Sequence, residues 1–272
     1  MQFIRCRNNQ QHNIQSFSTL LFCKMKKKTI ITSLLLFLAV ISQAQTRKIQ
    51  HKPYIDLRPL HFGILVGMNL QDIEFDNIGP QTITLEDGTT QEKTILCDAD
   101  RWNSGFTVGV LADLRLSQHL NLRFTPSMHF GAKHLTFHNM TDLTQEGRPM
   151  EQMQDMKNTY ISFPVDLKFS AERWNNYRPY IMAGVNPMIN LTSKNQEYIQ
   201  LKRSDFFLEV GLGCDFYLPF FKLIPELKFC YSLQDALDHN HASELKDANM
   251  RMYTNSVKAG HSKMIVLTFY FE

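Results

Sequence analysis

The sequence predicts an all-β protein, an eight-stranded antiparallel up-and-down transmembrane β-barrel with short periplasmic turns and long extracellular loops. Three features support this fold class: an export signal near the N-terminus, about eight segments in which apolar and polar residues alternate, and connections that alternate between short and long. Alternation with a period of two is the pattern of a β-strand. Short turns at one end and long loops at the other are typical of outer-membrane barrels.

The first element, from Met25 to Ala44, has the layout of a secretory signal peptide. Three lysines precede an apolar run from Leu34 to Ile41, and small residues then stand at Ser42 and Ala44. A membrane-spanning helix needs about 20 apolar residues, so this run is too short to remain as an anchor. We therefore predict a signal peptide at 25–44, with the true start at Met25, and cleavage between Ala44 and Gln45. Residues 1–24 are then an upstream extension. The mature chain is predicted to consist of a periplasmic lead at 45–59 and an outer-membrane β-barrel at 60–272.

The strands follow in order, and the first shows the pattern that all share. Between His61 and Leu70, bulky apolar residues such as Phe62, Ile64 and Val66 alternate with small or polar ones. Segments of about 10 to 12 residues match a tilted bilayer crossing, whereas soluble strands average about 5 to 6. The strands are expected at 61–70, 105–116, 120–133, 160–169, 178–185, 206–217, 223–231 and 264–271.

The connections between these strands alternate in length. Long polar connections are expected at 71–103, 132–157, 186–203 and 232–262, and short ones near 117, at 171–177 and at 218–221. Pro126, Pro164 and Pro225 fall within predicted strands, where a closed barrel has no edge that tolerates a missing N–H. We predict bulges or shortened strands at these three prolines.

Volume and charge decide which face of each strand points inward. A soluble barrel would have the same period with the faces exchanged. The interior of an eight-stranded barrel is only wide enough for side chains to fill it, and about five large apolar residues from each strand would overfill it. The opposite face combines charged residues with small ones such as Gly63, Gly67, Gly109 and Gly211. The polar face is therefore expected inside and the apolar face in lipid.

The inward face is predicted to carry a network of charges that pair across the lumen. Turned towards lipid, each basic residue would cost about 2 to 4 kcal/mol near the middle of the membrane. Lys133 and Lys168 are expected at water-exposed rims. The predicted network consists of Asp113, Arg115, Arg123, Asp166, Glu209, Asp215, Glu226 and Lys228.

Aromatic residues gather near the ends of the predicted strands. Amphipathic rings favour the level of the lipid headgroups, although aromatic residues are also ordinary components of strands. The residues expected at the headgroup level are Trp102, Tyr160, Trp174, Tyr177, Tyr180, Tyr217, Phe220, Phe221 and Tyr270.

Composition excludes several classes of function. Residues 1–44 contain six basic residues and no acidic one, so removing them from 29 basic and 26 acidic residues leaves a net charge of about −3. A nucleic-acid partner is not expected of a chain without a basic excess. The remaining cysteines, Cys97, Cys214 and Cys230, do not form a disulfide framework. Cys214 and Cys230 could pair if their strands are neighbours, or point to opposite faces as buried small side chains.

No catalytic, metal or cofactor site is expected. Ser127 and His129 share the inward face beside Arg123, but a nucleophile that acts on lipid must be reachable from the bilayer or the rim, so a polar filling role is favoured. No glycine-rich phosphate loop or nucleotide fingerprint is present. A filled eight-stranded lumen also argues against a diffusion pore, which needs about 16 strands.

Three segments carry a resemblance to a known family: His61–Asn69, Asn175–Tyr180 and Phe221–Phe229. From about His61 to Glu272 the chain resembles the PorT family of outer-membrane barrels, components of the type IX secretion system of Bacteroidota. The first segment is common in barrels, and the other two, which join short periplasmic turns to strands, are more specific. The resemblance implies a non-enzymatic part in moving folded cargo across the outer membrane.

Two kinds of partner surface follow from these expectations. One is a candidate periplasmic docking turn for another secretion component, which combines aromatic and basic side chains at the membrane edge: Trp174, Asn176, Tyr177 and Arg178. The alternative is that this turn only anchors the barrel at the membrane interface and has no partner. A second class of function is a stand-alone surface barrel whose long loops bind a ligand, an adhesin or lipopolysaccharide. A third is a lipid-modifying enzyme.

Overall fold

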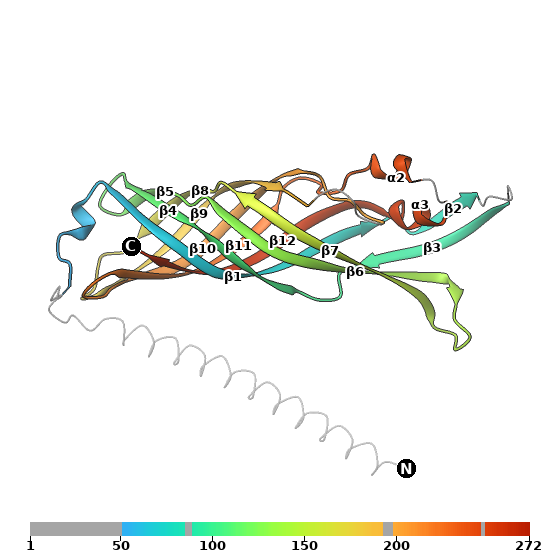
Figure 1. The fold of residues 1–272 in the computed structure, drawn as a ribbon, viewed down its shortest axis with the longest axis horizontal. Coiled ribbons are helices and arrows are strands. Elements are labelled where there is room, and N and C mark those ends of the chain that lie inside the picture. The colour runs from blue at the N-terminus through green and yellow to red at the C-terminus, as the bar shows by residue number, and fades with distance from the viewer. Residues whose placement is uncertain (1–50, 85–88, 193–197, 246–247) are drawn as a thin grey trace, which may run out of the picture. The chain divides into compact units, whose positions relative to one another are not determined.

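The computed structural model describes residues 51–84, 89–192, 198–245 and 248–272, which belong to one compact unit. It is an all-β antiparallel barrel in which twelve strands form one sheet (Figure 1). Along the sheet the strand order is β10-β11-β12-β1-β4-β5-β8-β9-β7-β6-β3-β2, and β9 also pairs with β10. That last pairing closes the wall, so the backbone of the wall needs no lipid-facing partner.

The strands differ widely in length, and the helices are short. The strands are β1 (Leu60–Asn77), β2 (Pro80–Thr84), β3 (Thr90–Asp98), β4 (Asn103–Arg115), β5 (Leu120–Phe124), β6 (Ser127–Leu143), β7 (Pro149–Ser162), β8 (Val165–Ser170), β9 (Tyr177–Asn190), β10 (Ser204–Tyr217), β11 (Lys222–Ser232) and β12 (Val257–Phe271). The helices are η1 (Ile55–Leu57), α2 (His241–Glu244) and α3 (Ala248–Thr254). Within the described ranges, no helix has the length and apolar character needed to span a membrane.

Two prolines explain part of the difference between the eight strands predicted and the twelve observed. The third predicted strand divides into β5 and β6 at Thr125–Pro126, and the fourth divides into β7 and β8 at Phe163–Pro164. The wall continues across both breaks, since the N–H of Val110 donates to the carbonyl of Pro126 and that of Phe163 to Pro187, each at 3.1 Å. The expected break at Pro225 is wrong: β11 runs through it and pairs it with Phe269.

The other difference lies in the connections that we predicted as long polar loops. Strands β1, β6, β7 and β12 continue far beyond the predicted crossings, and the β2–β3 hairpin is added beside them (Figure 1). We call this part, together with α2, α3 and the segments between them, the head. The head has an apolar core formed by Ile73, Ile95, Cys97, Leu135, Phe137, Met156, Ile199, Leu201, Ala236, Leu237, Met252 and Val257.

The outer wall carries a band of exposed apolar side chains that ends at a sharp level. On β1, Phe62 and Val66 are 66% and 45% exposed, whereas Leu65 between them is 3% exposed. Beyond Leu70 the outward side chains become acidic, beginning with Asp72. The same change occurs on β12, where Ile265 pairs with Leu70 and Lys263 pairs with Asp72. Strand rise and tilt give this band a height of about 25 Å, the thickness that a bilayer requires.

The two ends of the barrel are built differently. Short turns join β4 to β5, β8 to β9 and β10 to β11, and the described start of the chain and the C-terminus lie at the same end (Figure 1). We call this the turn end. The head occupies the opposite, or loop, end.

The described cysteines Cys97, Cys214 and Cys230 are all free thiols. Cys230 points into the barrel, where its Sγ lies 3.5 Å from Oε2 of Glu209. Cys214 belongs to the outward set on β10 and is half-buried. The two therefore point to opposite faces, one of the two arrangements that the sequence left open, but Cys214 is not fully buried.

Replacing Val66 by arginine should lower the free energy of unfolding in lipid vesicles by about 2 to 4 kcal/mol, because a guanidinium group would then face acyl chains near the middle of the band. The matched control is Asp76→Arg, which changes an exposed residue of the same strand beyond the band and should shift the free energy by less than about 0.5 kcal/mol. Urea titration measures both. Equal losses in the two variants would contradict the assignment of the band to lipid.

Candidate functional site

The centre of the lumen is organised around the guanidinium group of Arg123, which is fully buried. Arg123 extends from β5 and binds Oδ2 of Asp113 on β4 at 3.0 Å and Oε2 of Glu226 on β11 at 2.6 Å. The hydroxyls of Tyr180 and Tyr270 donate to Glu226 at 2.5 and 2.6 Å. A charged donor thus joins strands on opposite sides of the lumen through charge-assisted hydrogen bonds.

A second cation, Lys228 on β11, gathers three carboxylates around its ammonium group. Its Nζ lies 3.1 Å from Asp166, 3.3 Å from Glu209 and 3.5 Å from Glu226. The amide of Asn186 also donates to Glu209 at 3.1 Å. Because Glu226 contacts both cations, the groups around Arg123 and Lys228 form one continuous network.

The network extends towards the turn end through two more lysines. Lys168 binds Asp215 at 2.8 Å, and Lys222 binds the same carboxylate at 3.3 Å. Lys222 also binds the side chain of Glu272 at 3.1 Å, next to the end of β12. Removing one partner from buried pairs of this kind leaves an uncompensated charge, which costs about 3 to 5 kcal/mol.

All predicted members of the network lie in it except Arg115. Arg115 is half-buried at the turn end, where its guanidinium group lies 3.3 Å from the carbonyl of Ser117 and 3.4 Å from that of Leu57. The expectation that Lys133 and Lys168 lie at water-exposed rims is wrong, because they are 2% and 1% exposed. Lys133 instead donates to the hydroxyl of Ser262 at 2.7 Å.

Sequence reasoning missed the tyrosines of the lumen. Tyr160, Tyr180, Tyr217 and Tyr270 were expected at the headgroup level but are at most 4% exposed, all inside the barrel. Each occupies an inward position in the period-two pattern, which was the signal available in the sequence. Lys222 and Glu272, at the ends of their strands, were missed as well. The expected aromatic residues that are exposed are Trp102, Tyr177, Phe220 and Phe221.

Ser127 and His129 lie in a buried cluster of hydroxyls and one imidazole. Nδ1 of His129 lies 2.9 Å from Oγ1 of Thr107, and its Nε2 lies 3.0 Å from Oγ of Ser162. A cavity beside His129 and Glu209 has a volume of about 10 Å³, which is room for about one water molecule. Side chains therefore fill the lumen at this level.

The predicted docking turn is divided between exposed and buried residues. Trp174 and Tyr177 form a backbone bridge at the start of β9, where Tyr177 is 41% exposed and Trp174 is half-buried. Arg178 is 8% exposed, and its guanidinium group donates to the carbonyls of Ala171 at 2.8 Å and Gln118 at 2.5 Å. Arg178 therefore holds two turns together instead of facing a partner.

The same turn binds the chain's own N-terminal lead through Arg173. Its guanidinium group donates to the carbonyls of Lys52, at 3.0 Å, and His51. It also stacks 3.5 Å above the ring of Tyr217, whose hydroxyl donates to Asp56 at 2.7 Å. The amide of Asn176 accepts the N–H of His51 at 3.1 Å. We call these contacts the Arg173 latch.

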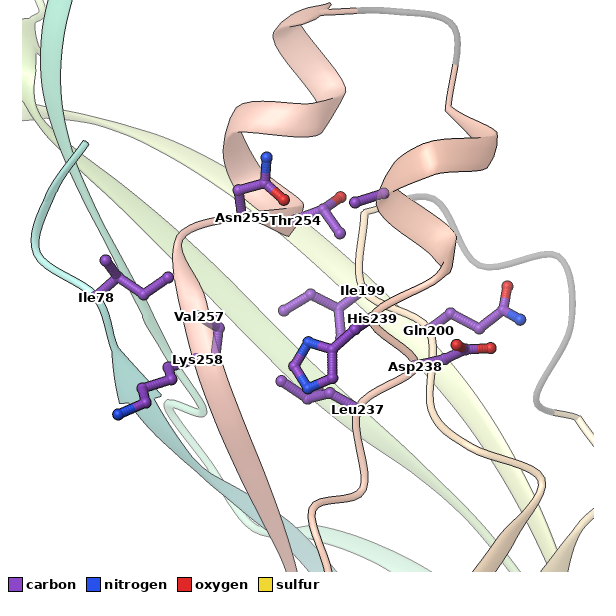
Figure 2. Close-up of a pocket in the computed structure, with 11 residues that line it drawn as sticks. Ile78, Ile199, Gln200, Leu237, Asp238, His239, Thr254, Asn255, Val257 and Lys258 are labelled. Atoms are coloured by element: carbon purple, nitrogen blue, oxygen red, sulfur yellow. The ribbon is translucent and has the colours of Figure 1, made fainter. Parts of the chain in front are cut away.

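The loop end holds a pocket of about 310 Å³, large enough for a small ligand. Its floor consists of Ile199, Leu237 and Val257, which belong to the core of the head. Figure 2 shows the ring of His239 in the middle of the pocket and the side chain of Lys258 pointing away from it. The polar residues around the pocket are Gln200, Asp238, His239, Thr254, Asn255 and Lys258.

One carboxylate fixes the walls of this pocket. Asp235 accepts hydrogen bonds from the N–H groups of Gly260 at 2.9 Å and Leu237 at 3.2 Å, and its other oxygen lies 2.7 Å from Nε2 of His239. Desolvation opposes the charge on Asp235, but these donors outweigh it and lower the pKa of the carboxyl group. Asp235 thus stays ionised and orients the imidazole of His239.

The predicted cleavage site, Ala44 and Gln45, lies outside the described residues. No group of histidine, cysteine and acidic residues within the described part of the chain is arranged to hold a metal ion.

A closed antiparallel sheet with an apolar outer band and a charged lumen defines the class of integral β-barrel membrane proteins. The outer membrane protein beta-barrel domain family matches residues 43–238, and the chain belongs to this family. It is therefore an outer-membrane protein. In such barrels the short turns face the periplasm and the longer loops face outwards.

Three solved structures match this chain at 12 to 13% sequence identity. OprG from Pseudomonas aeruginosa is 12% identical with a TM-score of 0.45, and the match covers 83% of this chain and 99% of OprG. Neisserial surface protein A is 12% identical with a TM-score of 0.36, covering 78% and 98%. Ail of Yersinia pestis, solved with the heparin analogue sucrose octasulfate, is 13% identical with a TM-score of 0.32, covering 77% and 96%. No curated protein matches the sequence.

Replacing Arg123 by methionine should lower the free energy of unfolding by about 3 to 5 kcal/mol, because Asp113 loses its cation and Glu226 loses one of two. The control is Arg115→Met at the rim, with an expected loss below about 1 kcal/mol. Urea titration of the barrel in detergent measures both. Similar values would show that the lumen network does not hold the strands together.

Replacing Arg173 by alanine should release the lead and leave the barrel intact, since the latch contacts only residues at the turn end. Chymotrypsin, which cuts after aromatic residues such as Tyr54, should then cleave the lead at least several times faster. Arg58→Ala is the control, because Arg58 is an exposed basic residue just beyond the lead segment held by the latch. Unchanged cleavage with normal heat-modifiable migration on gels would rule out the latch.

Proposed function

We propose that this chain is a non-enzymatic component of the type IX protein secretion machinery and belongs to the PorT family of Bacteroidota. The observation that supports this proposal is that the two more specific PorT-like segments lie side by side in the fold. Asn175–Tyr180 and the start of Phe221–Phe229 meet at the turn end, which this proposal assigns to the periplasm. There the N–H of Tyr217 donates to the carbonyl of Asn176 at 2.8 Å and that of Leu218 to Phe221 at 3.0 Å. The resembling residues thus form one periplasmic surface.

We also propose that the membrane-spanning wall has eight crossings. β5 and β6 share β4 as a neighbour, and β7 and β8 share β9, so each of these pairs counts as one crossing interrupted by a proline. The β2–β3 hairpin pairs with β6 only beyond the apolar band. An eight-stranded wall is consistent with a lumen that side chains fill completely.

A filled lumen supports a function at the ends of the barrel. Folded cargo is far wider than the lumen, in which Arg123 and Lys228 link opposite strands. In this proposal the barrel holds other secretion components at its periplasmic surface. Trp174 and Tyr177 make the contact, whereas Asn176 and Arg178 keep the turn in shape.

The proposal includes export by the signal peptide, with cleavage between Ala44 and Gln45. The mature chain would then begin with a short lead that the Arg173 latch holds against the periplasmic surface. N-terminal sequencing of the protein purified from outer membranes tests this point, and a retained apolar run from Leu34 would overturn it.

A second candidate function is a surface barrel that binds a small ligand or lipopolysaccharide from outside. The observation that favours it is the preformed pocket on the head, with its apolar floor and the imidazole held by Asp235. Nothing in this function requires a partner in the periplasm.

Deleting the gene distinguishes these functions. The secretion proposal predicts loss of type IX cargo export with an otherwise intact outer membrane. The surface-barrel function predicts normal export and loss of ligand binding to intact cells. A lipid-modifying enzyme predicts altered acylation of lipid A or phospholipid in the same strain.

Within the secretion proposal, Trp174→Ala should reduce cargo export at least about fivefold, because removing a buried interface aromatic commonly costs more than 1 kcal/mol of binding free energy. The chain offers a matched control in its only other tryptophan, Trp102, which lies beyond β3 at the opposite end. Trp102→Ala should leave export unchanged. Wild-type export from the Trp174 variant at normal barrel levels would eliminate this docking surface.

A further inference from the structure

The wall of the head contains a gap between β1 and the β3–β4 segment. On the side of the gap nearer the membrane, β1 pairs with β4, and the last pair of this ladder is Gln71 with Asn103. On the far side, β2 pairs with β3, and the first pair of that ladder is Pro80 with Thr94. The intervening stretches, 72–79 and 95–102, have equal lengths, so the register is the same on both sides. Within these described stretches, no backbone ladder joins β1 to β3.

The gap has a cause on the other side of β3. Asp98 lies opposite Thr136 of β6, and Phe106 lies opposite Phe130. Between these pairs the β3–β4 segment spans 99–105, whereas β6 spans only 131–135. The two extra residues make the segment bulge, and it follows β6 instead of β1.

A side chain takes the place of a backbone partner at the top of the gap. The amide of Asn77 donates to the carbonyl of Cys97 at 3.0 Å and accepts its N–H at 2.7 Å. The backbone of Cys97 therefore points into the gap with the spacing of a strand edge, and Asn77 imitates one residue of a neighbouring strand.

The walls of the gap combine apolar and acidic side chains, and Lys263 and His138 also line it. Its volume is about 500 Å³. Ile73 and Cys97, each 1% exposed, form an apolar floor that belongs to the core of the head. The outward residues next to them are Asp72, Glu74, Leu96 and Asp98. An occupant that matched both walls would present apolar side chains inward and basic side chains outward, with a period of two.

Of the three acidic residues of the gap, only Glu74 has an ion-pair partner among the described residues. Lys263 binds Glu74 at 2.5 Å and lowers the pKa of that carboxyl group. Asp72 and Asp98 form no ion pair within the described part of the chain, and Oδ1 of Asp72 is buried there without a hydrogen-bond donor. Desolvation raises the pKa of Asp72. A cationic group at this place would relieve that cost.

We propose that the gap accepts an extended polypeptide segment with alternating basic and apolar residues, which adds a strand between β1 and β3. The backbone of the segment pairs with the edges of the two strands below Asn77, which no backbone ladder covers, as in β-augmentation. Its basic side chains bind Asp72 and Asp98, and its apolar side chains lie on Ile73 and Cys97. The site is on the outer side of the membrane and does not depend on the secretion proposal.

Charged residues at a strand edge can also serve only to prevent pairing with other chains. The experiment must therefore separate strand addition from simple charge attraction. The probes are three fluorescent peptides: one that alternates lysine and valine, one with glutamate in place of lysine, and the lysine peptide with alternate backbone amides N-methylated. N-methylation removes backbone donors and keeps the charge.

The lysine peptide should bind the purified mature barrel in detergent at least about tenfold more tightly than either of the other peptides. The double variant Asp72→Asn, Asp98→Asn should weaken its binding by about tenfold, and Asp76→Asn, an acidic residue of β1 that does not line the gap, should not. Heat-modifiable migration confirms that each variant is folded.

Three outcomes would overturn the proposal. Equal binding of the N-methylated peptide would show attraction by charge alone. Equal weakening by Asp76→Asn would place the peptide elsewhere on the acidic surface. Failure of the lysine peptide to bind the folded barrel would show that the edges are closed to an added strand, and none of these results would bear on cargo export.

Discussion

The wall and the lumen of this barrel depend on the cost of placing an unpaired polar group next to lipid. Closing the sheet pairs the backbone of the wall, and turning the charges inward pairs most of the side chains. The fully buried Arg123 is an example, because its guanidinium group reaches across the lumen to Glu226. Lys228 and two tyrosine hydroxyls contact the same carboxylate. The ion pairs that keep charge away from lipid also hold opposite strands together and fill the space between them.

Because side chains fill the lumen, the two ends of the barrel are the surfaces available for binding other molecules. The turn end is a compact surface of short turns to which Arg173 fastens the lead, and the segments that resemble the PorT family meet there. The loop end is a head with an apolar core, a ligand-sized pocket and a gap in its wall. The same chain therefore has one candidate binding surface at its turn end and two candidate sites at its loop end.

The period-two pattern predicted the faces of the wall well, because the cost of charge in lipid leaves one acceptable orientation. It placed Asp113, Arg123 and Glu226 in the lumen but could not exclude Arg115, since the pattern specifies a face and not a height along the axis. The head was missed because Ile95, Phe137 and Ile199 come from distant, mostly polar segments and form a core only in the folded chain. The lumen tyrosines were predicted at the headgroup level because they stand near strand ends, whereas their inward positions in the pattern place them in the lumen.

The apolar core of the head has a thermal consequence. Hydrophobic association weakens on cooling. The core that joins Ile73, Leu135 and Phe137 therefore loses strength in the cold. An organism that grows at low temperature would need additional polar contacts in the head to keep the outer end of this barrel ordered.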